Sequence, residues 1–181
     1  MRRLLILGVV AAVAVGGFVV ASRSSGPKFD TFRDRTGGFS VTYPAEWIAH
    51  APKDPNLRLF LQVKADSADS ATFRVDETQS VVNPADLVYV KSFTDAVISG
   101  SHPNVAQHGA VTLNGLSGYY YRYTITDASS GQTLIHFHYF VFQGHKMFSF
   151  VLQAVPADLA ANSGRLATQF DQIRASFQGS A

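Results

Sequence analysis

The sequence predicts an α+β fold, a three-layer α/β/α sandwich built around a central antiparallel sheet. Its second half contains four strand-like segments, which are separated by short turns that contain glycine. These segments carry apolar residues on both alternating sides, so both faces of the sheet need cover. Two amphipathic segments with helical period can supply that cover, one for each face.

The start of the chain predicts that the rest of the protein works outside the cytoplasm. Arg2 and Arg3 precede an uninterrupted apolar run over residues 4–21, close to the roughly 20 residues that a membrane-spanning helix needs. The same run, with small residues before Ser22, also fits a cleaved signal peptide. Positive charge at the amino end predicts a single-pass protein of the cell membrane with its domain outside, or alternatively a secreted protein.

The domain organisation follows from this leader and from the length of the remaining chain. A short stretch rich in serine, glycine and proline suits a flexible connection, and the rest is long enough for one well-buried core. The prediction is a signal anchor or signal peptide over residues 1–23, a tether over 24–28 and a single domain over 29–178.

Elements of the first half are expected in the order strand, strand, strand and helix. Residues 39–43, 57–63 and 72–78 alternate apolar and polar side chains, as half-buried strands do. The following helix is expected to be capped by Asn83 and to stop at Gly100.

The second half predicts an antiparallel meander and a closing helix. The short turns leave no room for crossover helices, so neighbouring strands should pair antiparallel. A cone-shaped fold of the nuclear-transport-factor type is the alternative, although its helices usually come early in the chain. The expected strands cover residues 105–113, 118–126, 133–142 and 147–155, and the helix covers 158–176.

Composition excludes several classes of protein. The chain has no cysteine, so neither a disulfide nor a lipid-modified cysteine is available. It carries 15 basic and 13 acidic residues, and Arg2 and Arg3 account for the whole difference. A neutral domain lacks the concentrated positive charge that phosphate binding needs, so no nucleic-acid partner is expected.

Three segments resemble the PsbP-like superfamily, which includes photosystem II accessory proteins, a Ran-binding import factor and the LpqN group of bacterial envelope proteins. The similar segments are GFSVTYPAEW at residues 38–47, LNGLSGYYYRY at 113–123 and the closing helix near Phe177. The resemblance implies a sandwich of helices around an antiparallel sheet, without catalysis, that docks to partners. The lipoprotein cysteine expected in the LpqN group is absent.

Aromatic residues suggest a ligand pocket. Flat rings with a polar tip suit a sugar, a lipid or an aromatic compound. The same tyrosines could equally pack beneath the helices, and only alternate members of the run can face one cavity. The candidate ligand-binding residues are Trp47, Tyr119, Tyr121 and Tyr123.

Histidines suggest a metal site. His136 and His138 lie two apart in a strand and share a face, and His145 follows the next turn. Imidazoles so placed can hold zinc or copper when a further ligand is present. Hydrogen-bonded histidines under a helix are the simpler interpretation, so no cofactor is predicted.

No catalytic motif is present. The sequence has no nucleophile elbow, no phosphate-binding glycine loop and no zinc-protease histidine pair. We therefore expect a non-catalytic extracytoplasmic envelope protein that acts as a docking or accessory module for a protein partner, tethered to the membrane if the leader is uncleaved. The alternative is a carrier of a small ligand or a metal, using the sheet edge and the histidines.

Overall fold

The computed structural model describes residues 28–52, 54–63, 71–101, 103–161 and 164–179. The predicted leader and most of the predicted tether lie outside these ranges. Within them, no helix combines the length and the apolar character that crossing a bilayer requires.

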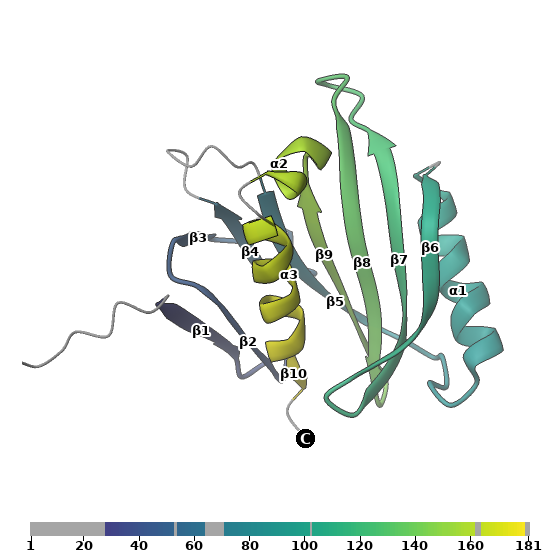
Figure 1. The fold of residues 1–181 in the computed structure, drawn as a ribbon. Coiled ribbons are helices and arrows are strands. Elements are labelled where there is room, and N and C mark those ends of the chain that lie inside the picture. The colour runs from purple at the N-terminus through teal and green to yellow at the C-terminus, as the bar shows by residue number, and fades with distance from the viewer. Residues whose placement is uncertain (1–27, 53, 64–70, 102, 162–163, 180–181) are drawn as a thin grey trace, which may run out of the picture.

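The main sheet has seven antiparallel strands and forms the middle layer (Figure 1). The predicted meander is confirmed, because each of the last four strands pairs with its neighbour in the chain. The sheet also joins the two halves of the sequence through a long-range pairing of β5 with β9. In spatial order the strands are β3 (Trp47–His50), β4 (Leu57–Val63), β5 (Ala71–Gln79), β9 (Lys146–Ala154), β8 (Thr133–Gln143), β7 (Leu116–Thr126) and β6 (Asn104–Leu113).

A second, three-stranded sheet lies beside α3. It consists of β1 (Phe29–Asp34), β2 (Phe39–Pro44) and β10 (Gln178–Gly179), with β2 in the centre. The predicted strand over residues 39–43 therefore exists, but outside the main sheet. Its Phe39 ring stacks on Phe177 with ring centroids 5.6 Å apart, so the small sheet shares a core with the end of the chain.

Both predicted helices differ in their bounds. The first, α1 (Leu87–Ser99), is capped by Asp86, whose carboxylate accepts from the Tyr89 amide. The predicted cap, Asn83, instead accepts from the Ala85 amide in a separate turn. The closing helix is two helices rather than one, α2 (Pro156–Ala160) and α3 (Arg165–Ser176). Gly164 lies between them at φ 77°, a left-handed conformation that ends α-helical continuity.

The layers confirm the predicted sandwich. On one face, Val90 and Ile98 of α1 pack on tyrosines and phenylalanines of β7 and β8. On the other face, Phe170 and Ile173 of α3 share a larger core with the small sheet and with β4, β5, β8 and β9. β8 carries apolar side chains on both faces because α1 packs on one face of this strand and the α3-side core packs on the other.

The cover is staggered, which was not predicted. In Figure 1, α1 lies behind the β6–β7 side of the sheet, whereas α3 and the small sheet lie in front of the β4–β5–β9 side. Two parts of the sheet are therefore only partly covered by the described elements, and Phe137 borders α3. We call them the open β6–β8 surface, with Gln107, Tyr120, Arg122 and Phe137, and the open β3–β5 surface, with Ile48, His50, Phe60 and Arg74.

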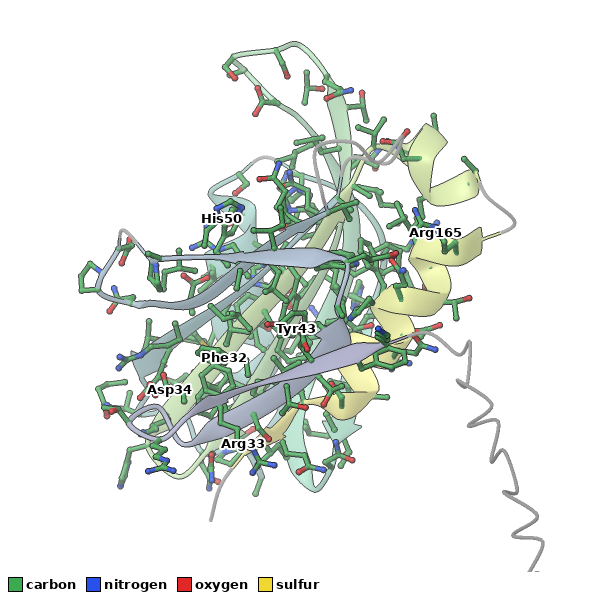
Figure 2. The ribbon with its side chains drawn as sticks, turned by 90° about the vertical axis from the view of Figure 1, so that its left-hand side faces the viewer. Phe32, Arg33, Asp34, Tyr43, His50 and Arg165 are labelled. Atoms are coloured by element: carbon green, nitrogen blue, oxygen red, sulfur yellow. The ribbon has the colours of Figure 1, made fainter. Side chains whose placement is uncertain are left out.

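A buried ionic cluster joins the small sheet to the main one. Glu77, only 7% exposed, lies 3.0 Å from the Nε of Arg58 and 3.0 Å from the Nζ of Lys146. The same Lys146 ammonium donates to the Gly37 carbonyl in the β1–β2 turn. The cluster therefore holds the hairpin end, where Figure 2 labels Asp34, against the main sheet.

Candidate functional site

The polar side chains on the α1 face form one continuous row. Tyr119, Tyr121 and Tyr123 project from the same side of β7, as their alternation predicts. The pairing register places His108 beside Tyr121 on one side, and His138 and His136 opposite Tyr121 and Tyr123 on the other. We call these six residues the tyrosine–histidine row.

The first two tyrosine hydroxyls have partners within the protein. The Tyr119 hydroxyl lies 3.0 Å from the Nδ1 of His108. Tyr121 donates to the Asp95 carboxylate of α1 at 2.8 Å and lies 2.7 Å from the Thr94 hydroxyl. Burial raises the pKa of Tyr121 far above its usual range, so the phenol stays neutral and acts as a fixed link between β7 and α1.

The third hydroxyl bridges two histidines. Tyr123 lies 3.2 Å from the Nδ1 atoms of both His136 and His138, and the Nε2 of His138 lies 2.6 Å from the Ser149 hydroxyl. Because a phenol has one proton, it donates to one imidazole and accepts from the other. The result is a directional chain of hydrogen bonds beneath the surface.

Burial sets the charge state of this chain. It raises the pKa of Tyr123 to about 12 and lowers the pKa of His136 to about 4 and that of His138 to about 3. All three groups are therefore neutral near pH 7. None of them is poised to exchange a proton at physiological pH, which is the property expected of a general acid or base.

The four predicted ligand-binding residues do not line one cavity. Trp47 belongs to the core on the α3 side, where its Nε1 donates to Gln169 and its ring contacts the edge of Phe170. The three tyrosines lie on the α1 side, so the sheet separates them from Trp47. Sequence periodicity places the tyrosines together, but it cannot relate them to a strand far away in the chain.

The three predicted metal ligands do not come together either. His136 and His138 both direct Nδ1 to Tyr123, whereas His145 lies in the β8–β9 turn, seven residues beyond His138. At about 3.3 Å per residue that separation is roughly 20 Å along the strand. Among the described residues, no group of three or more histidines, cysteines and acids could hold a metal.

Two grooves beside the row are open to solvent, and neither was predicted. One, of about 430 Å³, lies between α1 and β6 and is lined by residues that include Asp95, His108 and Tyr121. The other, of about 320 Å³, lies on the open β3–β5 surface beside His50, Phe60 and Arg74. In Figure 2, His50 and Arg165, the first residue of α3, are labelled on opposite sides of the molecule. The sequence could not locate these grooves, because their position depends on which part of each sheet face a helix covers.

The strand edges differ in their protection. β1 carries three charged residues in six, β3 has four residues and β10 has two. In contrast, the outer strand β6 has ten residues without a charged side chain, and its pairing is irregular only between Val105 and Gln107. Long uncharged edges are unusual in proteins that have no partner for them.

These observations define an α+β sandwich whose polar row is mostly buried and whose exposed features are sheet surfaces and a strand edge. Comparison with solved structures shows that the fold is PsbP-like. No protein-family model matches the chain, and no curated protein is significantly similar to it in sequence.

Three solved structures illustrate the likeness. The cyanobacterial PsbP (CyanoP) of Synechocystis sp. PCC 6803 matches with a TM-score of 0.58 and 15% identity over 91% of this chain and 99% of that one. LpqN, involved in cell envelope biogenesis of Mycobacterium tuberculosis, matches at 0.55 and 15% over 88% and 94%. The Ran-binding protein Mog1p of Saccharomyces cerevisiae matches at 0.56 and 10% over 85% and 96%. At such identities the likeness establishes the fold.

Proposed function

We propose that this protein is a non-catalytic accessory module of the cell envelope that docks onto another protein. The observation that carries the proposal is the burial of the tyrosine–histidine row, in which every residue except His108 is buried. The tyrosine hydroxyls and imidazoles of the row are mostly buried and hydrogen-bonded within the protein, and the shifted pKa values keep His136 and His138 neutral. The exposed features are two open sheet surfaces and the uncharged edge strand β6. A surface of this kind suits a macromolecule better than a substrate.

The proposed location rests on the leader. The apolar run over residues 4–21, preceded by two arginines, supports export of the domain. LpqN, a protein of the same fold, is described as involved in cell envelope biogenesis. A membrane-impermeant amine reagent should label Lys91 in intact cells, because its side chain is 43% exposed. Labelling only after lysis would contradict an exported domain.

Crosslinking on intact cells tests the docking function. A discrete partner should be recovered in similar yield from independent preparations, and its recovery should not depend on His136 or His138. If no partner is recovered while the purified protein takes up lipid or sugar, the docking function is wrong and ligand carriage replaces it.

A second candidate is carriage of a small ligand or a metal ion. It is favoured by the groove of about 430 Å³, which falls within the range of small-molecule sites, and by His136 and His138, whose rings lie on the same face of β8. Zinc titration of the wild type and of the double variant His136→Ala, His138→Ala decides. Tight stoichiometric zinc binding by the wild type that the double variant loses would support metal carriage. If the wild type does not bind zinc tightly, metal carriage is excluded.

A further inference from the structure

A narrow apolar crevice lies between α3 and β8, at the margin of the open β6–β8 surface. Phe137 and Tyr139 of β8 form its base, and Ala167 and Phe170 of α3 form its wall. The Phe137 and Phe170 rings meet edge to face at 5.8 Å. The volume is about 70 Å³, which is room for about five water molecules, or a single side chain.

Two guanidinium groups flank this crevice. Arg122 of β7 lies over the Phe137 ring at 5.5 Å, and Arg174 of α3 lies over the Tyr139 ring at 5.8 Å. Phe137 and Tyr139 are two residues apart on one face of β8, so the two cations follow each other along the strand. Stacking on rings leaves the edge of each guanidinium free to bind a carboxylate.

Both cations have unused hydrogen-bonding capacity. Arg122 is exposed, and no carboxylate pairs with it in the described ranges. Arg174 pairs with Asp171 through Nη2 at 3.1 Å, but its Nε is buried and has no acceptor among the described residues. The margin of the crevice is therefore positively charged, with one acid beside two arginines.

We propose that this crevice binds an acidic segment of a protein partner, taking one apolar side chain into the cavity while neighbouring carboxylates bind Arg122 and Arg174. The proposal rests on the docking function and names the chemistry of the partner. The small volume favours a side chain over a free ligand, because small-molecule sites are typically about 300 Å³ or larger. It also favours a peptide over an acyl chain, which needs a longer channel.

A blocked model peptide can test this binding directly. In an extended chain, alternate side chains project from one side, so acetyl-Asp-Gly-Phe-Gly-Asp-amide presents a ring between two carboxylates. The full chain in mild detergent is titrated with this peptide by calorimetry and by fluorescence. Trp47 is the only tryptophan, and its ring lies 6.2 Å from that of Phe170 in the crevice wall, so its emission reports occupancy.

We expect saturable binding that depends on both the carboxylates and the aromatic ring of the peptide. Replacing the two acids of the peptide by asparagine, or its phenylalanine by alanine, should weaken binding about 10-fold or more. Arg122→Gln should weaken it by a similar factor, and Ala167→Leu should abolish it by filling the cavity. Arg35→Gln, an exposed change in the β1–β2 turn, is the matched control and should leave binding unchanged.

Several results would overturn the inference. These are no binding at millimolar peptide, equal binding of the asparagine peptide, or binding that Arg122→Gln and Ala167→Leu both leave intact. Arg122→Gln replaces an exposed side chain, so it remains informative even if Ala167→Leu fails to fold. Binding of phosphatidylglycerol vesicles through Arg122, without binding of the peptide, would assign the surface to lipid instead. Recovery of a crosslinked partner that Arg122→Gln leaves unaffected would reject the crevice while keeping the docking function.

Discussion

Acidification from pH 7 to pH 5 is expected to destabilise this fold through His136 and His138. Burial lowers the pKa of His136 from 6.5 to about 4 and that of His138 from 6.5 to about 3, and both return to the ordinary value on unfolding. Because the folded-state pKa values are depressed, the stabilisation is complete above pH 6.5 and is lost as the pH falls toward 4 and 3.

The magnitude follows from the number of protons bound. Near pH 5 both imidazoles are almost fully protonated in the unfolded chain and almost neutral in the folded one. Each such proton contributes about 1.4 kcal/mol per pH unit, so the free energy of unfolding should fall by about 2.5 kcal/mol per unit near pH 5. Between pH 7 and pH 5 the loss is about 4 kcal/mol, a large share of the 5–15 kcal/mol that is typical of a domain.

Urea unfolding followed by circular dichroism at several pH values measures this slope. His136→Gln and His138→Gln should each remove about half of it. His50→Gln, an exposed histidine, is the control and should leave it unchanged. Comparing slopes within each variant cancels the stability that the substitution itself removes. If the full wild-type slope persists in both variants, carboxylates carry the pH dependence and the reasoning is refuted.

Two further predictions concern the packing of the sheet. Glu77→Gln should lower the free energy of unfolding by about 1–3 kcal/mol, because the partly exposed charges of Arg58 and Lys146 lose the buried carboxylate that pairs with both. Urea unfolding at pH 7 measures the loss, and an unchanged free energy of unfolding would contradict it. Gly118→Ala should cost at least about 1–3 kcal/mol, since a Cβ there collides with a backbone carbonyl of β8. Gly100→Ala, where a Cβ makes only an ordinary 3.8 Å contact with the Val97 carbonyl, is its control in thermal unfolding, and equal midpoints would contradict the clash.

Local signals in the sequence account for the meander and for the faces of its strands. Turns at Gly115 and Gly144, both at positive φ, set the hairpins, and alternation placed His136 and His138 on one face with the tyrosines. The pairing of β5 with β9 could not be predicted, because it joins segments that are separated by a helix and three strands. The start of α1 was misplaced because Asn83 and Asp86 are both good capping residues, and only tertiary contacts choose between them.

The candidate site was only partly accessible to sequence reasoning. The shared side of Tyr119, Tyr121 and Tyr123 follows from period two, but the hydroxyl partners depend on the register with β6, β8 and α1. Trp47 begins a strand too short and too exposed to show alternation, so its face was undefined. The staggered cover, which creates the open surfaces, depends on where each helix settles over the sheet, and amphipathicity alone does not specify that position.

Site-specific photo-crosslinking in intact cells tests most directly whether this protein docks through its open β6–β8 surface. Gln107 of β6 is exposed and lies opposite Arg122 in the register, whereas Thr31 of β1 is exposed on the other sheet. A photoreactive residue at Gln107 should give one discrete adduct with a partner protein, and the same residue at Thr31 should give none. Equal adducts at both positions, or none at Gln107, would contradict docking through this surface.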